Sequence, residues 1–278
     1  MQKTELTING SKGKPITLDI TFNKNGNEKP VLIFCHGFKG FKDWGHFNLI
    51  AEAFANHDFT FVKFNFSYNG TTTEHLTDFA DLEAFGDNNF SIELDDLGLA
   101  IDYMKENAAF YEGNHDHLFL MGHSRGGGIA ILKASRDKRI KKLVTWASVK
   151  DAADFFSTQD LEVWQKSGKV FTFNSRTKQN MPLNFQFYEN YYTNKQQLDI
   201  PKAAACLNIP WLILHGSNDT SVPFATGEQL HQWNSGSKWI LIDHADHTFG
   251  GKQPYTESDL PADTKTAVRE TIHFLNNG

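Results

Sequence analysis

The chain has 278 residues, of which 40% are hydrophobic and 22% are charged, so it is long enough for one large or two small globular domains. The net charge of −6 is spread along the chain without a basic stripe, which argues against a nucleic-acid surface. No apolar run approaches the ~20 residues of a membrane-spanning helix, and two cysteines do not form a disulfide framework.

The amino-terminal segment alternates polar and apolar residues and lacks the continuous apolar stretch of a secretory signal. Cys35 lies in an apolar run, where a free cysteine acts as a small buried hydrophobic residue. We therefore expect a cytoplasmic protein with no membrane or nucleic-acid partner.

Two alternating segments, Thr4–Ile8 and Ile16–Phe22, flank a turn sequence and predict an antiparallel hairpin. Short, continuously apolar runs follow, and such runs are typical of strands in a sheet covered on both faces. These runs are Pro30–Cys35, Phe59–Phe64, Leu118–Met121, Leu143–Trp146, Trp211–Leu214 and Trp239–Ile242. The helix-like stretches between and after them are Phe47–Ala55, Ile92–Lys105, Ile129–Ser135, Thr226–Trp233 and Thr264–Leu275. This alternation predicts an α/β fold with a mostly parallel, doubly wound sheet.

One connection is longer than a helical crossover requires, because roughly sixty residues separate Trp146 from Trp211. The excess is rich in aromatic residues: Phe155, Phe156, Trp164, Phe171, Phe173, Phe185, Phe187, Tyr188, Tyr191 and Tyr192. We expect a single domain over residues 1–278 that contains a small lid insertion at 150–205. The rings either form only the core of this lid or also line an acyl pocket.

A G-x-S-x-G pattern lies in the segment FLMGHSRGGG, with Ser124 at its centre. An apolar strand precedes it and a helix-like run follows it, which is the context of a nucleophile elbow. In such an elbow a strained turn presents the serine hydroxyl beyond the strand, next to a helix N-terminus that favours negative charge. The alternative is a glycine-rich nucleotide-binding turn, but the segment lacks G-x-G-x-x-G spacing and the lysine of a P-loop.

A nucleophilic serine needs a base, and the base needs an acid that orients it. Asp219 follows the apolar run at Trp211, and His247 follows the run at Trp239. Both residues therefore lie beyond the carboxyl ends of predicted strands, where the catalytic groups of open parallel sheets gather. Asp151 and Asp154, after the run that ends at Trp146, are alternative positions for the acid.

The sequences GHSRGG, HGSNDTSVP and HADHTF resemble the nucleophile, acid and histidine signatures of the α/β-hydrolase superfamily, and CHGF resembles its oxyanion-hole loop. The likeness covers nearly the whole chain, and its details are similar to the branch of acyl esterases, feruloyl-esterase-like enzymes and dienelactone-hydrolase-like proteins. It implies an α/β-hydrolase fold with Ser124, His247 and Asp219 as the triad. It also implies an oxyanion hole made by the backbone N–H groups of Phe38 and Arg125.

Several residues near these motifs have competing interpretations. A metal site at His244 and His247 is disfavoured, because a nucleophile elbow already requires one histidine there. The side chain of Arg125 either pairs with a nearby carboxylate or meets an anionic group of the substrate. We interpret Lys39 and Lys42 as surface charges.

The leading hypothesis is a cofactor-free hydrolase that cleaves carboxylic esters of small acyl substrates through an acyl-enzyme. Thioesterase and amidase or peptidase activity would use the same residues, so both stay open. A non-catalytic ligand-binding member of the fold is disfavoured because every triad residue is present. Dehalogenase and epoxide hydrolase activities are disfavoured because they need aspartate at position 124.

Overall fold

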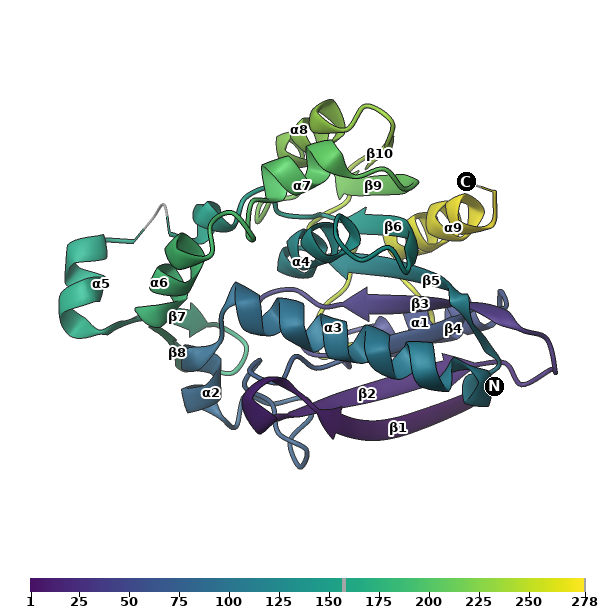
Figure 1. Ribbon diagram of the computed structural model, residues 1–278, viewed down its shortest axis with the longest axis horizontal. Coiled ribbons are helices and arrows are strands. Elements are labelled where there is room, and N and C mark those ends of the chain that lie inside the picture. The colour runs from purple at the N-terminus through teal and green to yellow at the C-terminus, as the bar shows by residue number, and fades with distance from the viewer. Residues whose placement is uncertain (157–158, 278) are drawn as a thin grey trace.

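The computed structural model describes residues 1–156 and 159–277 (Figure 1). Within them, an eight-stranded sheet has the strand order β1-β2-β4-β3-β5-β6-β9-β10. The strands are β1 (Gln2–Asn9), β2 (Pro15–Phe22), β3 (Lys29–Cys35), β4 (Thr60–Phe64), β5 (Gly113–His123), β6 (Ile140–Trp146), β9 (Trp211–Gly216) and β10 (Lys238–Ile242). β2 pairs antiparallel with β1 and β4, and all other neighbours in this sheet are parallel. The predicted fold class and amino-terminal hairpin are confirmed.

Helices cover both faces of the sheet (Figure 1). α1 (Phe47–Ala55) and α9 (Ala262–Asn277) pack with the strand residues Leu32 and Phe34. On the other face, α3 (Phe90–Asn107), α4 (Arg125–Ala134) and α8 (Ala225–Trp233) pack with the alternate residues of the same strand, Val31 and Ile33. Successive side chains of a strand point to opposite faces, so one continuous apolar run supplies both cores.

Three further short elements precede β6 in the chain. They are the 3₁₀ turns η1 (Ser11–Gly13) and η2 (Ala108–Tyr111) and the helix α2 (Leu82–Asp87). α4 begins at Arg125, four residues earlier than predicted, because close packing under the sheet favours helix in a glycine-rich segment of low intrinsic propensity. In the described ranges, no helix combines the length and the apolar character needed to cross a membrane.

The long connection after β6 contains η3 (Ala152–Phe155), α5 (Leu161–Ser167), the two-stranded antiparallel sheet of β7 (Lys169–Asn174) and β8 (Gln179–Asn184), α6 (Gln186–Thr193) and α7 (Ile200–Cys206). α5, β7 and β8 project beyond the sheet at the left of Figure 1, while α7 packs between α4 and α8. Residues 157 and 158 of the predicted lid lie outside the described residues. We refer to 150–205 below as the insertion.

Candidate active site

Ser124 stands between β5 and α4 with φ 56° and ψ −123°, a conformation that residues other than glycine rarely adopt. Its amide donates a hydrogen bond to the carbonyl oxygen of Trp146 at 2.9 Å, which ties the turn to β6. A Cβ on Gly126 would lie 2.4 Å from the carbonyl oxygen of Cys35, so glycine is required where α4 passes the end of β3. The strained turn holds Ser124 against a cavity beyond the sheet.

Asp219 follows β9, and its side chain is fully buried. Its Oδ1 accepts hydrogen bonds from the amides of Ser221 and Val222, both at 2.8 Å. Its Oδ2 lies 2.7 Å from His247 Nδ1 and 3.2 Å from His215 Nε2. Burial alone would raise the pKa of Asp219, but the hydrogen bonds from His215 and His247 hold it well below its usual range. The carboxyl group is therefore ionised and can only accept.

His247 lies in the loop after β10, and His123, next to the nucleophile, anchors it. His123 Nε2 lies 2.8 Å from the backbone carbonyl oxygen of His247, and the two ring centroids are 4.8 Å apart. Because a carbonyl only accepts, His123 carries its proton on Nε2. Burial, and then the neighbouring His247, lower the pKa of His123 to about 3, so this ring is neutral.

The loop after β3 approaches the nucleophile closely. A Cβ on Gly37 would lie 2.9 Å from Ser124 Cβ, so this approach also requires glycine. The backbone amides of Phe38 and Arg125 donate no hydrogen bond to any other residue in the described ranges. Arg125 is the first residue of α4, where amides have no partner within the helix.

Two cavities, of about 510 Å³ and 150 Å³, share Phe38, Lys39, Ser124 and His247. The larger one is also lined by Val149, Asp154, Phe155, Ser221, Val222, Pro223 and Thr226. No hydrogen bond between Ser124 and His247 is present in the described residues, although both border each cavity. Contacts of this kind are often long before a substrate binds.

Arg125 turns its side chain away from solvent and pairs with a carboxylate, Glu93 on α3, with Nε 2.9 Å from Oε2. Four aromatic rings surround its guanidinium group at 4.2–5.5 Å from the ring centroids: Phe38, Phe90, Phe155 and Phe187. The side chain therefore links the start of α4 to α3, to the loop after β3 and to the insertion.

The interpretation of Lys42 as a surface charge is wrong. Its side chain is 2% exposed and pairs with Asp19 and Asp43. Lys39 is half-buried and lines both cavities, with its Nζ 3.4 Å from the carbonyl oxygen of Phe173. Asp19 and Phe173 are distant from these lysines in the sequence, and local charge patterns do not reveal such contacts.

The surroundings of the other candidate acids, Asp151 and Asp154, and of the candidate metal ligand His244 differ from those of Asp219. Asp151 Oδ1 accepts from the amide of Ala153 at 2.9 Å and from the Tyr191 hydroxyl at 3.3 Å. Asp154 borders the larger cavity, and burial raises the pKa of its carboxyl. His244 is 84% exposed, and the described residues contain no group of three metal-ligating side chains. The acid that contacts His247 is Asp219.

Two residues at this edge were not singled out from the sequence. His215, four residues before Asp219, contacts both Asp219 and the carbonyl oxygen of Val222, the latter at 2.8 Å. His123 anchors His247, as described above. The only available signal was their place inside the motifs HGSND and GHS, because their partners are set by the tertiary fold.

The fold and this arrangement of residues define an α/β hydrolase. A family model described as BD-FAE matches residues 18–234, and the chain belongs to this family. The resemblance to the α/β-hydrolase superfamily that the motifs carry is thereby confirmed.

Some solved structures share the fold, and some curated proteins are similar in sequence to part of this chain. Est1E from Butyrivibrio proteoclasticus, solved with ferulic acid bound, has a TM-score of 0.71 at 16% identity over 98% of each chain. The α/β hydrolase GrgF from Penicillium sp. sh18 has a TM-score of 0.71 at 15% identity, covering 99% of this chain and 98% of that one. Esterase-5B of Drosophila miranda and that of Drosophila persimilis are 29% identical over 153 residues, 53% of this chain and 25% of theirs. The chain thus spans about a quarter of the length of these curated relatives.

Proposed function

We propose that this chain is a serine hydrolase that cleaves carboxylic esters of small acyl substrates through an acyl-enzyme intermediate. One observation carries the proposal. A histidine that is hydrogen-bonded to a buried carboxylate, His247 Nδ1 to Asp219 Oδ2 at 2.7 Å, borders the same cavities as a serine in a strained elbow.

The tautomer of His247 follows from its partner. Asp219 is ionised and can only accept, so Nδ1 of the neutral ring carries the proton and Nε2 is left as the base. In the proposed mechanism, Ser124 Oγ attacks the ester carbonyl while His247 takes its proton. His247 then gives that proton to the leaving alcohol, and an acyl-enzyme remains. Attack by water, activated in the same way, releases the acid and restores Ser124.

The negative charge that develops on the carbonyl oxygen needs donors that are already in place. The amides of Phe38 and Arg125 are suited to this role, because neither donates to another described residue. The N-terminus of α4 adds a favourable dipole at the same position. The Arg125 side chain points into its aromatic surroundings and supports this helix start through Glu93.

His215 also contacts the acid, at the same carboxylate oxygen that contacts His247. Its Nε2 lies 2.8 Å from the carbonyl oxygen of Val222, so that nitrogen carries a proton that it also directs at Asp219 Oδ2, 3.2 Å away. Together with the amides of Ser221 and Val222, it fixes the carboxylate from several directions. We assign His215 to positioning the acid.

The larger cavity is the proposed acyl pocket. Val149, Phe155, Val222 and Pro223 give it apolar walls beside Ser124, which is the usual composition of a small-ligand pocket. Est1E, which shares the fold, is solved with an aromatic acid, ferulic acid. We therefore include esters with aromatic acyl groups among the proposed substrates.

The direct test combines turnover with labelling. We expect the chain to hydrolyse p-nitrophenyl butyrate and to be labelled by a fluorophosphonate at Ser124, located by peptide mass spectrometry. Matched thioester and anilide substrates measure the other reactions that the same residues could perform. Absence of both turnover and labelling would show that the chain is a non-catalytic member of the fold.

A further inference from the structure

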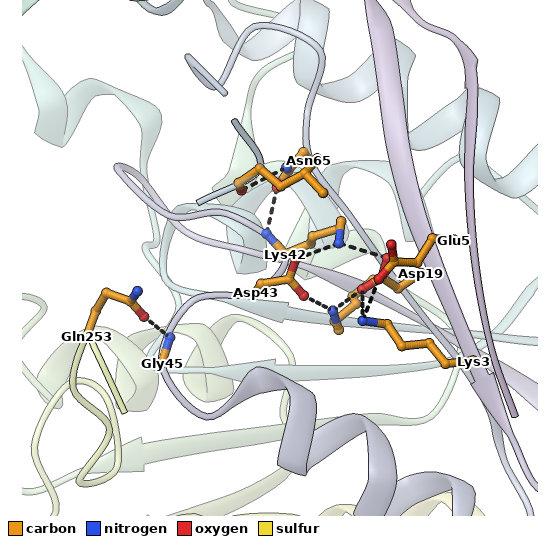
Figure 2. A network of polar contacts seen from close by, with 10 residues as sticks. Lys3, Glu5, Asp19, Lys42, Asp43, Gly45, Asn65 and Gln253 are labelled. Carbon is orange, nitrogen blue, oxygen red and sulfur yellow. Dashed lines mark hydrogen bonds and ion pairs between the residues drawn. The ribbon is translucent and has the colours of Figure 1, made fainter. Parts of the chain in front are cut away.

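A ring of four alternating charges joins the loop after β3 to strands β2 and β4 (Figure 2). Asp19 on β2 and Lys63 on β4 face one another in the strand register and form one half. Lys42 and Asp43, from the loop after β3, form the other half. Lys42 contacts Asp19 at 2.7 Å and Asp43 at 2.5 Å, while Lys63 contacts Asp19 at 2.5 Å and also Asp43. Each cation therefore touches both carboxylates.

The ring is buried, and its carboxylate at Asp43 is ionised. The side chains of Asp19 and Lys63 are fully buried, that of Lys42 is 2% exposed and that of Asp43 is 13% exposed. Burial alone would raise the pKa of Asp43, but Lys63 and Lys42 hold it well below its usual range. Lys3 at the exposed rim adds a contact to Asp19 at 3.0 Å.

Stability does not account for such a ring. Apolar residues of similar volume often stabilise a fold as well as a buried ion pair does, because the charges lose their hydration. The two strands, moreover, are already joined by their backbone ladder. What Lys42 and Asp43 add is a fixed connection between this ladder and the loop.

The same loop is held at two further points, both drawn in Figure 2. The amide of Lys42 donates to Asn65 Oδ1 at 2.6 Å, and the amide of Gly45 donates to the side chain of Gln253. Asn65 follows β4, and Gln253 lies in the loop that carries His247. The segment after Phe38 is therefore tied both to the sheet and to the histidine loop.

We infer that this charge ring positions the loop after β3 so that the Phe38 amide meets the developing oxyanion. The inference rests on the proposed function, because it assigns Phe38 as an oxyanion donor. Donors of this kind act only when their positions are fixed to within a few tenths of an ångström. Lys42, Asp43, Asp19 and Lys63 are then positioning residues that never touch the substrate.

The test is the double variant Lys42→Met/Asp43→Asn. It removes the loop half of the ring without changing net charge and leaves Asp19 paired with Lys63. We expect kcat for p-nitrophenyl butyrate to fall about 10- to 100-fold, somewhat less than the loss on deleting an oxyanion donor. KM should stay within about twofold, since the oxyanion forms only in the transition state. Affinity for a trifluoromethyl ketone, whose adduct with Ser124 bears an oxyanion, should fall by a similar factor.

The matched control is Lys29→Met/Glu112→Gln, at the opposite end of β3. Lys29 is fully buried and contacts Glu112 at 2.7 Å, so this variant also removes one buried ion pair. It should unfold at lower urea concentration than the wild type and keep its kcat. The single variant Lys42→Arg retains the positive charge and should keep most of the wild-type kcat.

The outcomes separate the two proposals. If the wild type neither turns over ester nor labels at Ser124, the proposed function fails. If the wild type is active but the loop variant keeps its kcat, or loses activity through KM alone, the positioning role is wrong. If the loop variant does not fold by circular dichroism, Asp43→Asn alone is measured; an unchanged kcat and ketone affinity would overturn the inference.

Discussion

The carboxyl edge of the sheet and the insertion are held together by different forces. At the edge, short polar contacts fix the side chains, as in the 2.7 Å contact between His247 and Asp219. In the insertion, aromatic rings pack on one another, with Phe156 lying 5.1 Å from Phe187 and 5.3 Å from Tyr191 between centroids. Polar contacts define atomic positions, whereas ring packing defines a shape and tolerates small shifts. Bond-making chemistry needs defined atomic positions, whereas the wall of a binding pocket needs only a defined shape.

The largest expected effect is at the edge itself. Ser124→Ala should reduce kcat for p-nitrophenyl butyrate by about a million-fold, because it removes the nucleophile on which the other groups act. The variant should unfold at the same urea concentration as the wild type, since only a hydroxyl is lost. Normal turnover by this variant would show that Ser124 is not the nucleophile and that the carboxyl edge of the sheet does not perform the chemistry.

A second prediction concerns the acid. Asp219→Asn should lower kcat by about 10⁴-fold, because His247 would lose the acceptor that fixes its tautomer. Asp151→Asn is the matched control, and it should be nearly silent in a kcat measurement. Asp151 contacts Ala153 and Tyr191 within the insertion. The reverse result would move the acid to the segment after β6.

The third prediction uses pH, because buried histidines gather at the edge and the insertion contains none. Burial lowers the pKa of His36 and of His46 to about 4, and that of His123 to about 3. The unfolded chain, with ordinary values near 6.5, therefore binds more protons below that pH. Their contribution to the free energy of unfolding is complete above about pH 6.5 and is lost as the pH falls toward about 4.

Urea unfolding at successive pH values between 6.5 and 5 measures this effect as a slope of up to about three protons. His123→Phe should reduce the slope by about one proton, and it should cost about 1 kcal/mol at pH 7 through the lost bond to His247. His244→Phe, at a side chain that is 84% exposed, should leave the slope unchanged. An equal slope in both variants would mean that these buried rings do not control acid stability.

The two regions also differ in how well the sequence predicted them. The sequence predicted the core strands because each is a continuous apolar run, and it predicted the nucleophile elbow from the glycines around Ser124. The insertion was predicted as a small aromatic lid at 150–205, but its individual elements were not, because strands as short as β7 and β8 give a weak periodic signal. Lys42 was misjudged because its partners, Asp19 and Lys63, are brought to it by the sheet. A local sequence pattern does not reveal ion pairs between residues that are distant in the sequence.

The smallest expected effect concerns the insertion. Of its predicted rings, Phe155 lines the larger cavity with Ser124, while Phe156 is buried against other rings and Phe171 is 57% exposed. We expect medium-chain and aromatic acyl esters to be preferred over acetates. Each matched methylene group should add up to about 0.8 kcal/mol, or roughly fourfold in kcat/KM.

The measurement compares kcat/KM for acetate, butyrate, octanoate and cinnamate esters of p-nitrophenol. Phe155→Ala should flatten the rise with chain length, because it removes apolar wall next to the acyl group. Phe171→Ala removes an equal ring from the exposed side of β7 and should leave the series unchanged. A steady fall from acetate upward in the wild type would mean that the rings of the insertion pack only on each other. The insertion would then be a structural unit, and the selection of acyl groups would rest on the sheet edge alone.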